Sequence, residues 1–370
     1  MTTTQEDSPE VRRAQAAAAP STSPLQSHST SDLSVATSAW PAHLLSRIVR
    51  TALIAVSASA VILYVLFIQS DSEVSEALAA GQRRPVFDTR NSSIAVEEIR
   101  AGGPPKDGIP AISKPQLIGA SAANELVPSE RVIGVVINGE ARAYPLGILS
   151  YHEIVNDTLQ STPIAVTYCP LCDSVCVFDR RTPLGTREFG VSGLLYNSNV
   201  LMYDRGGNPE SLWSQLMTTG VTGPGMKKSL KTLPVELATW AEWKSRYPTT
   251  EVLSRDTGHY RDYSVSPYGR YFNTPQLMFP VNHQDHRLPA KTRVIGLWAA
   301  DQFVAVPVTA FSPDQTEIHS SVNGLKFTVV YAPDTKSMRV MQADSKVQWM
   351  YTFWFAWSAF HPETDLQLRP

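Results

Sequence analysis

Val166-Thr167-Tyr168-Cys169-Pro170 decides how this chain is organised, because the segment occurs a second time as Val329-Val330-Tyr331-Ala332-Pro333. The tyrosine and the proline recur, whereas alanine stands in place of the cysteine. The other two cysteines of the chain, Cys172 and Cys176, also fall opposite residues without sulfur. Because only one copy of the duplicated framework holds thiols, we expect the shared residues to be structural. The first copy is then the functional one.

Further matches extend the repeat on both sides of this segment. Residues 131–134 and 141–145 match residues 293–296 and 303–307, and each pair of blocks predicts a β-hairpin. In the first hairpin the turn is Asn138-Gly139, a pair typical of two-residue β-turns. We therefore predict a β-rich α+β domain in which two pseudo-repeats pack on each other.

The repeat also pairs single residues, and it leaves one long segment unmatched. His152, which precedes Val155-Asn156, is matched with His319, which precedes Val322-Asn323. Trp-x-x-Trp motifs close both copies, at residues 240–243 and 354–357. Only the first copy carries a long insertion, between Asp179 and about Thr239, and long insertions in a shared scaffold are often functional loops.

A run without charged residues, residues 51–69, precedes the repeat. As a helix with a rise of about 1.5 Å per residue it would span roughly 30 Å, the thickness of a bilayer core. Arginines flank its N-terminal side and acidic residues its C-terminal side, which predicts a cytoplasmic N-terminus. We therefore predict a single transmembrane helix within residues 47–70 that contacts the lipid bilayer through residues 51–69. A cleaved signal peptide and a buried core helix are the alternatives.

This placement predicts the remaining domain boundaries. Residues 1–46 are rich in Ser, Thr, Ala, Pro and Gln and lack hydrophobic periodicity, so we expect a disordered cytoplasmic tail. Residues 71–90 are predicted to be a polar stalk. The first repeat, with the insertion and the cysteines, is expected over residues 91–258, and the second over residues 259–370. Both would lie outside the cytoplasm in a protein of the cell membrane.

Composition argues against one class of partner. The formal net charge of the chain is −2, so there is no basic surplus to neutralise phosphates, and we expect no nucleic-acid partner. Outside the cytoplasm thiols can form disulfides, and with 3 cysteines at least one would stay unpaired.

Cys169 and Cys172 have the C-x-x-C spacing of dithiol redox centres and of metal-binding knuckles. No helix is predicted after the motif, which removes the usual support for a thioredoxin-like centre. Together with His152, and aided by Met202 or Cys176, the pair would suit copper or zinc. Two plainer interpretations stay open: His152 forms a framework hydrogen bond, as the match with His319 suggests, and the cysteines form a structural disulfide or are buried thiols.

A third interpretation makes Cys169 a nucleophile, with His152 as its base. Asn156, Asn197 or Asn199 would then orient the histidine. The residue types of Cys-His-Asn catalysis are present, but spacing alone does not bring them together.

The insertion contains a mixture of polar and aromatic side chains that suits a ligand pocket. Its glycines permit sharp turns, although asparagine and serine in such a segment also serve to satisfy buried turns. The candidate pocket residues are Ser192, Tyr196, Asn197, Asn199, Asp204, Trp213 and Gln215.

Several long blocks resemble a bacterial and archaeal family known as domain of unknown function 3179. The resemblance runs from about Gly103 to Ser254, and it implies no activity. The blocks that carry it are residues 106–110, 139–145, 152–157, 168–172, 190–199, 201–204 and 211–215.

Taken together, these patterns predict a membrane-anchored, extracytoplasmic protein with a site centred on Cys169. That site would bind a thiophilic metal or carry out thiol redox chemistry. The alternative is a non-catalytic module that binds a small molecule, a glycan or a partner protein at the cell surface.

Overall fold

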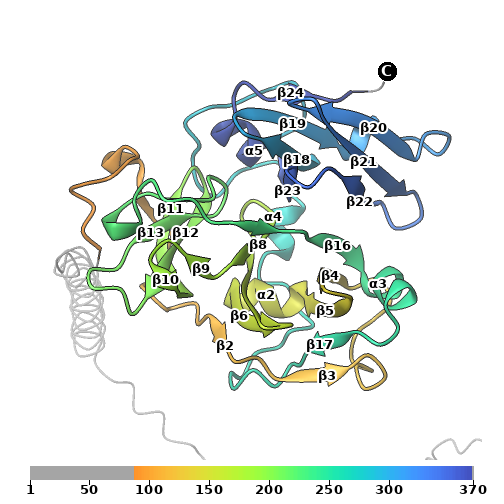
Figure 1. Cartoon of the computed structure of the whole chain (residues 1–370), viewed down its shortest axis with the longest axis horizontal. Helices are drawn as coiled ribbons and strands as arrows, with labels where there is room; N and C mark the ends of the chain where they lie inside the picture. The colour runs from red at the N-terminus through yellow and green to blue at the C-terminus, as the bar shows by residue number, and fades with distance from the viewer. Residues whose placement is uncertain (1–86, 369–370) are drawn as a thin grey trace, which may run out of the picture. The chain divides into compact units, whose positions relative to one another are not determined.

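A nine-stranded sheet contains strands from both halves of the chain in the computed structural model, which describes residues 87–368 (Figure 1). Its strand order is β2-β6-β7-β8-β23-β18-β19-β24, and β15 pairs with β8. The strands are β2 (Ile112–Ser113), β6 (Ile154–Leu159), β7 (Thr162–Cys169), β8 (Ser174–Asp179), β15 (Thr232–Leu233), β18 (Arg293–Ala299), β19 (Gln302–Pro307), β23 (Gln348–Phe353) and β24 (Asp365–Leu366).

A five-stranded sheet belongs to the first half alone, in the order β16-β4-β5-β17-β3. The hairpin between β4 and β5 turns at Asn138 and Gly139, whose φ angles of 50° and 84° are those of the predicted turn. The strands are β3 (Leu117–Gly119), β4 (Arg131–Ile137), β5 (Glu140–Pro145), β16 (Glu236–Thr239) and β17 (Glu251–Leu253).

The two halves repeat the same pairing pattern. β4 lies between β5 and β16 with both neighbours antiparallel, and β18 lies between β19 and β23 in the same way. β17 then adds to β5 in parallel, as β24 adds to β19. A helix precedes each of these parallel strands: α3 (Trp240–Arg246) in the first half and α5 (Trp354–Phe360) in the second.

Each half also contributes a three-stranded meander to the other half. The meander β6-β7-β8 of the first half joins β23 of the second, through the pair Val175 and Tyr351. The equivalent meander of the second half, β20 (Glu317–Val322), β21 (Leu325–Ala332) and β22 (Ser337–Ala343), lies beside β16 of the first. This reciprocal exchange is an approximate twofold arrangement, and it makes the halves interdependent.

One tryptophan in each half packs directly on a glycine of the central strand. The indole of Trp243 covers Gly134, and that of Trp357 covers Gly296. Each indole N–H donates a 3.0 Å hydrogen bond to a threonine hydroxyl, Thr250 or Thr364. The Trp-x-x-Trp motifs thus hold α3 and α5 against their sheets.

We expect Gly134→Ala to destabilise the domain by about 2 kcal/mol or more, because overpacking a filled core displaces side chains or backbone. A Cβ at this position would lie 2.1 Å from the Trp243 ring, whereas Gly269 has open space around it. Chemical denaturation of Gly134→Ala and of the control Gly269→Ala measures the difference. Equal stabilities of the two variants would contradict the packing argument.

The insertion of the first half forms a five-stranded sheet of its own, in the order β1-β11-β12-β13-β14. Between β17 and β18 the chain runs through residues 254–292, called the cover segment below, whose helix is α4 (Gly269–Phe272). The insertion sheet consists of β1 (Arg100–Ala101), β11 (Glu188–Tyr196), β12 (Asn199–Arg205), β13 (Leu212–Ser214) and β14 (Thr219–Gly220). The remaining elements are η1 (Val96–Glu98), α2 (Leu146–His152), β9 (Arg181–Thr182), β10 (Gly185–Thr186), η2 (Gly223–Gly225) and η3 (Val308–Ala310).

The predicted fold class needs one correction. It included a single transmembrane helix, whereas within residues 87–368 no helix is long and apolar enough to cross a membrane. The longest helices there, α2, α3 and α5, have 7 residues each. The fold that the structure describes is therefore a β-rich domain with short helices. Residues 47–70, like the predicted tail and most of the predicted stalk, lie outside the described residues.

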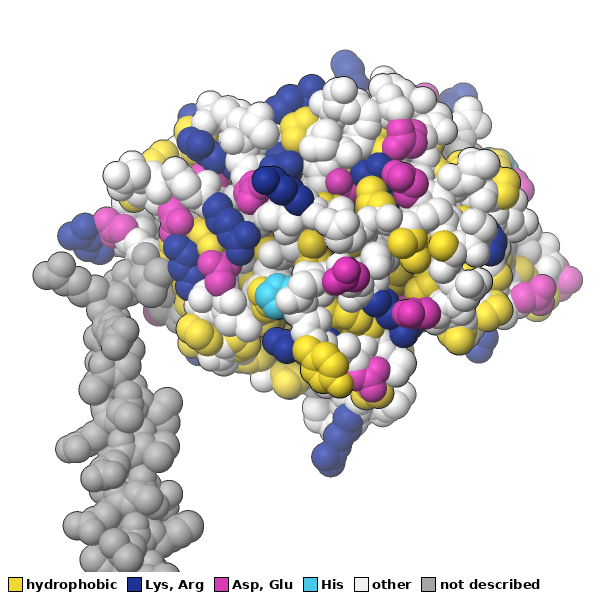
Figure 2. Space-filling model, turned by 90° about the horizontal axis from the view of Figure 1, so that it is seen from below, with side chains coloured by type: hydrophobic (Ala, Val, Ile, Leu, Met, Phe, Trp, Pro, Cys, Tyr) yellow, Lys and Arg dark blue, Asp and Glu magenta, His cyan; other side chains and the backbone are white. Residues whose placement is uncertain are grey.

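Charged side chains are mixed on the face of the molecule that Figure 2 shows. Lysine and arginine are interspersed with aspartate and glutamate, and no patch of one sign covers that face. This distribution agrees with the small net charge of −2.

Candidate thiol site

The C-x-x-C motif forms a tight connection between two buried strands. β7 ends at Cys169, and β8 begins at Ser174, which pairs with Cys169 across the ladder. The N–H of Cys172 donates to the carbonyl of Cys169 at 3.2 Å, and Asp173 completes the turn with a φ of 46°. A strand follows the motif, as expected from the repeat, so no helix dipole acts on the first thiol.

All three cysteines are buried and free, so of the plainer interpretation the structure shows the buried thiols and not the structural disulfide. Cys172 Sγ lies 3.2 Å from the carbonyl oxygen of Ser198 and within hydrogen-bonding range of Cys169 Sγ. Cys169 Sγ lies 3.9 Å from the same carbonyl. The two sulfurs of the motif therefore form a close pair inside the protein.

The surroundings of this pair distinguish one thiol from the other. Burial opposes ionisation of Cys169, but hydrogen bonds from the Cys172 thiol and from the amides of Val200, Cys172 and Leu171 outweigh it and lower its pKa. Burial, the hydrogen bond to Cys169 and the charge of Cys169 raise the pKa of Cys172 well above its usual value. Cys169 is thus disposed to be the thiolate, and Cys172 the thiol.

Glu153 is a buried acidic residue whose pKa responds to Cys169, and sequence reasoning missed it. It follows α2 with a φ of 57°, an uncommon conformation for a residue other than glycine. Its carbonyl accepts a 2.8 Å hydrogen bond from the N–H of Tyr168, which anchors it beside the end of β7. Burial, and then the charge of Cys169, raise the pKa of its carboxyl well above the usual value. Within residues 87–368 no group hydrogen-bonds to that carboxyl.

The cover segment closes over the pair. The Tyr271 hydroxyl donates a 2.8 Å hydrogen bond to the carbonyl of Leu171, in the middle of the motif. Burial and then the charges of Glu153 and Cys169 raise the pKa of Tyr268, which shows that Tyr268 lies near both groups. The Ser198 hydroxyl donates to the carbonyl of Phe279 at 2.6 Å, so the same segment also holds the insertion.

The insertion contributes a hairpin tip and a buried polar network below the thiols. β11 and β12 turn at Asn197 and Ser198, with φ angles of 48° and 61°, and this turn presents the Ser198 carbonyl to the sulfurs. Asn197 Oδ1 accepts from the N–H of Asn282 at 2.8 Å. Asn199 Nδ2 and the Ser174 hydroxyl both donate to Gln215 Oε1, at 2.9 and 2.6 Å. These amides therefore hold the wall of the thiol site rather than an open pocket.

The other candidate pocket residues take part in local packing. Asp204 Oδ1 accepts a 2.5 Å hydrogen bond from the N–H of Ser211, and the Trp213 ring meets Phe189 edge-on at 6.0 Å. The Tyr196 ring meets Phe360 edge-on at 5.5 Å. A ligand-binding role for these residues stays a prediction.

The hydrogen bonds of His152 go to groups other than the thiols. Nδ1 lies 2.7 Å from the carbonyl oxygen of Pro110, to which it donates, and Nε2 accepts from the Tyr263 hydroxyl at 2.7 Å. Burial lowers the pKa of His152 to about 4, so the ring is neutral at neutral pH. Both ring nitrogens are occupied. The roles of base and metal ligand predicted for His152 are therefore not supported by this geometry.

The predicted match of His152 with His319 is wrong, and the error has a simple cause. In the hairpins, Asn156 pairs with Ala165 and His319 pairs with Thr328, four positions from the turn in each. His319 is thus equivalent to Asn156, whereas His152 ends α2. Asn156 hydrogen-bonds to both backbone groups of Phe189, at 2.8 Å each, and so cannot orient a catalytic histidine.

The pKa of His152 predicts a pH dependence of stability. Because the folded value of about 4 lies below the ordinary value of 6.5, stability is complete above pH 6.5 and is lost as the pH falls toward 4. We expect His152→Asn to flatten the decline of Tm over this range. His361, whose pKa burial lowers to about 3, leaves a residual slope. The exposed His319 provides the control, and an unchanged slope in His152→Asn would contradict the assignment.

The described residues do not contain a cluster suited to a metal ion. Among them there is no group of three or more His, Cys, Asp or Glu side chains in ligand geometry. Cys176 points into the apolar core with Met202, and burial raises its pKa. The combination of Cys169, Cys172 and His152 that would suit copper or zinc is therefore not assembled here.

Comparison with known proteins agrees with the resemblance noted in the sequence. The family model described as "Protein of unknown function (DUF3179)" matches residues 106–349, more than half of the chain. No curated protein and no solved structure matches the chain.

Proposed function

From the premise that the chain belongs to the DUF3179 family, whose description states no activity, we propose from the site itself that Cys169 and Cys172 form a dithiol–disulfide redox centre. The observation that carries this proposal is that both sulfurs lie against the Ser198 carbonyl, at 3.9 and 3.2 Å, with the pKa of Cys169 lowered and that of Cys172 raised. Redox dithiols need this asymmetry, since one sulfur attacks as a thiolate and the other resolves the intermediate.

The proposed reaction transfers two electrons to a disulfide R–S–S–R. The Cys169 thiolate attacks one sulfur, the S–S bond breaks, and R–S⁻ leaves. Cys172 then loses its proton and attacks Cys169 Sγ, which forms the internal disulfide and releases the second R–S⁻. The pair gives up two electrons and the Cys172 proton, the second R–S⁻ takes its proton from water, and the products are two R–SH molecules.

Glu153 is the proton donor in this proposal. The raised pKa of its carboxyl favours the protonated form, which avoids a second negative charge beside the Cys169 thiolate. It gives a proton to the first departing thiolate and regains one when Cys172 ionises. A buried carboxylic acid with no hydrogen-bond partner within residues 87–368 suits this transfer.

The burial of the pair favours a small substrate. Cys169 is 1% exposed and Cys172 is 0% exposed, with the cover segment and the Asn197–Ser198 turn over them. A disulfide therefore reaches Cys169 only when the cover segment moves aside. The contacts to be broken include the hydrogen bonds that join Tyr271 to Leu171, Ser198 to Phe279 and Asn282 to Asn197.

Equilibration of the full chain in glutathione redox buffers tests the proposal. Peptide mass analysis after alkylation should show one disulfide, between Cys169 and Cys172, with a midpoint potential, while Cys176 stays alkylated. The proposal fails if the pair stays reduced across the whole range. Stoichiometric zinc or copper in the chain purified under reducing conditions would favour the metal-binding interpretation instead. A chain with neither property would favour the non-catalytic binding module.

A further inference from the structure

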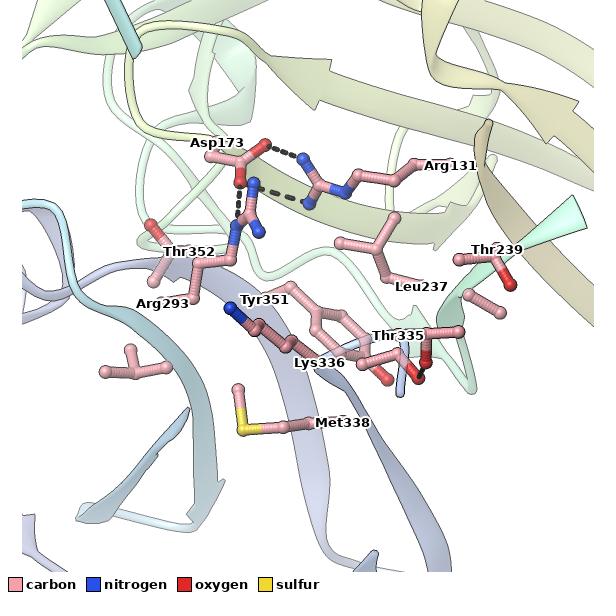
Figure 3. Close-up of a pocket in the computed structure, with 13 residues that line it drawn as sticks. Arg131, Asp173, Leu237, Thr239, Arg293, Thr335, Lys336, Met338, Tyr351 and Thr352 are labelled. Atoms are coloured by element: carbon pink, nitrogen blue, oxygen red, sulfur yellow. Dashed lines mark hydrogen bonds and ion pairs between the residues drawn. The ribbon is translucent and has the colours of Figure 1, made fainter. Parts of the chain in front are cut away.

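A cavity lies between the two halves, beside the turn that carries Cys172 and Asp173. Its volume is about 60 Å³, and it is lined by β16 of the first half and β23 of the second, together with the turns that follow β7 and β21 (Figure 3). A water molecule needs roughly 10–15 Å³ by this measure, so the cavity has room for about four. That is the size of a small oxyanion.

The lining of the cavity follows the approximate twofold relation of the halves. Arg131 and Arg293 occupy equivalent positions at the start of β4 and β18, and both line it. Asp173 and Lys336 occupy equivalent positions in the two turns, with φ angles of 46° and 54°. The symmetry is thus broken in charge at this position: an acid stands in one half where a lysine stands in the other.

The Asp173 carboxylate neutralises only part of the positive charge around it. Its carboxylate accepts both Nη groups of Arg131, at 2.9 and 3.0 Å, and Nε of Arg293 at 2.9 Å. Within residues 87–368 the Nη groups of Arg293 and Nζ of Lys336 form no hydrogen bond. In Figure 3 Lys336 extends toward Arg293 across the cavity.

The carboxylate of Glu242 is the second negative group nearby, and it is engaged elsewhere. It accepts from the hydroxyls of Thr335 and Ser337, at 2.5 and 2.7 Å, and caps α3 through Thr239. Three cations thus face two carboxylates, which leaves one positive charge and the open donors of Arg293 and Lys336 without an anion.

Tyr351 forms part of the wall of this cavity. Its side chain lines the cavity and is buried, and its hydroxyl has no hydrogen-bond partner among the described residues. The amides of Leu237 and Val340 lie near this hydroxyl, but not in hydrogen-bonding geometry. Because this oxygen has almost no accessible surface, it does not face the cavity, and it is not a donor of the proposed site.

We propose that this cavity binds a small tetrahedral oxyanion of the phosphate class. Arg293 and Lys336 donate to it from opposite halves. Charge-assisted donors of this kind are those that proteins use for phosphate. The bound anion would bridge the halves at the point where their symmetry is broken, and the proposal is independent of the thiol chemistry.

Calorimetric titration of the full chain with inorganic phosphate tests the site, at constant ionic strength set with chloride. We expect saturable binding that Lys336→Asn weakens about tenfold or more, because a hydrogen bond to a charged group is lost. Asparagine tolerates the left-handed backbone at this position. The exposed Lys326, which lies outside this cavity, provides the matched control as Lys326→Asn, and it should bind as the unaltered chain does.

Three results would overturn the proposal. They are the absence of heat and of a Tm increase at about 10 mM phosphate, equal affinity in Lys336→Asn and Lys326→Asn, and tighter binding of acetate than of phosphate. If Lys336→Asn does not fold, Lys336→Gln replaces it. Loss of Cys169 should leave the phosphate titration unchanged, which separates this site from the redox centre.

Discussion

Cys169→Ser is expected to abolish oxidation of the dithiol pair and to remove the most rapidly alkylated thiol of the chain. The lowered pKa of Cys169 gives it the larger thiolate fraction, and each unit of pKa changes that fraction about tenfold. Cys176, also buried but with a raised pKa, is the matched control. Cys176→Ser should leave both oxidation and alkylation unchanged. Stopped-flow alkylation and peptide mass analysis measure the two effects.

Cys172→Ser should behave differently from Cys169→Ser, and this difference tests the assigned roles. Without its resolving thiol, Cys169 can attack a small disulfide but cannot be released, so the mixed disulfide should accumulate in stoichiometric amounts. Cys169→Ser should accumulate none. If both variants trapped the mixed disulfide to the same extent, the two thiols would be equivalent, and the asymmetry argued from their hydrogen bonds would be wrong.

Local features of the fold were predictable because short-range chemistry determines them. The turn at Asn138-Gly139 follows from the backbone angles that these residues tolerate, and the Trp-x-x-Trp motifs mark equivalent helices in both halves. The exchange of meanders was not predictable, since a repeat shows which strands are equivalent and not which copy each one joins. Strand pairing across the halves depends on the complete core.

The sequence indicated the cysteines of the candidate site but not the groups that surround them. Glu153 resembles any polar residue after a helix in sequence, and only the folded backbone buries it beside Cys169. Residue identity pairs His152 with His319, but the distance from the hairpin turn pairs His319 with Asn156. The cover segment has no strong periodicity, so its place over the motif required the structure.

Asp173→Asn should destabilise the domain by about 3 kcal/mol, because a buried carboxylate loses its charge-assisted hydrogen bonds to two arginines that stay partly exposed. Asp173 holds one arginine from each half, Arg131 and Arg293, so its loss weakens the junction that the exchanged meanders depend on. Asparagine has the same shape and tolerates the left-handed backbone, so charge is the main change. For a domain of this size, the Tm should fall by about 10 °C.

Lowering the pH provides an internal control for the Asp173→Asn variant. Burial opposes ionisation of Asp173, but the charges of Arg131 and Arg293 outweigh it and lower its pKa below the ordinary 3.8. The stability that the carboxylate contributes is therefore present above pH 3.8 and is lost as the pH falls through the folded value. The Tm difference between the unaltered chain and Asp173→Asn should shrink in that range. Asp88→Asn, at the exposed pair with Arg90, should leave the Tm unchanged. If Asp173→Asn changed the Tm no more than Asp88→Asn does, the junction would owe its stability to strand pairing and apolar contacts alone.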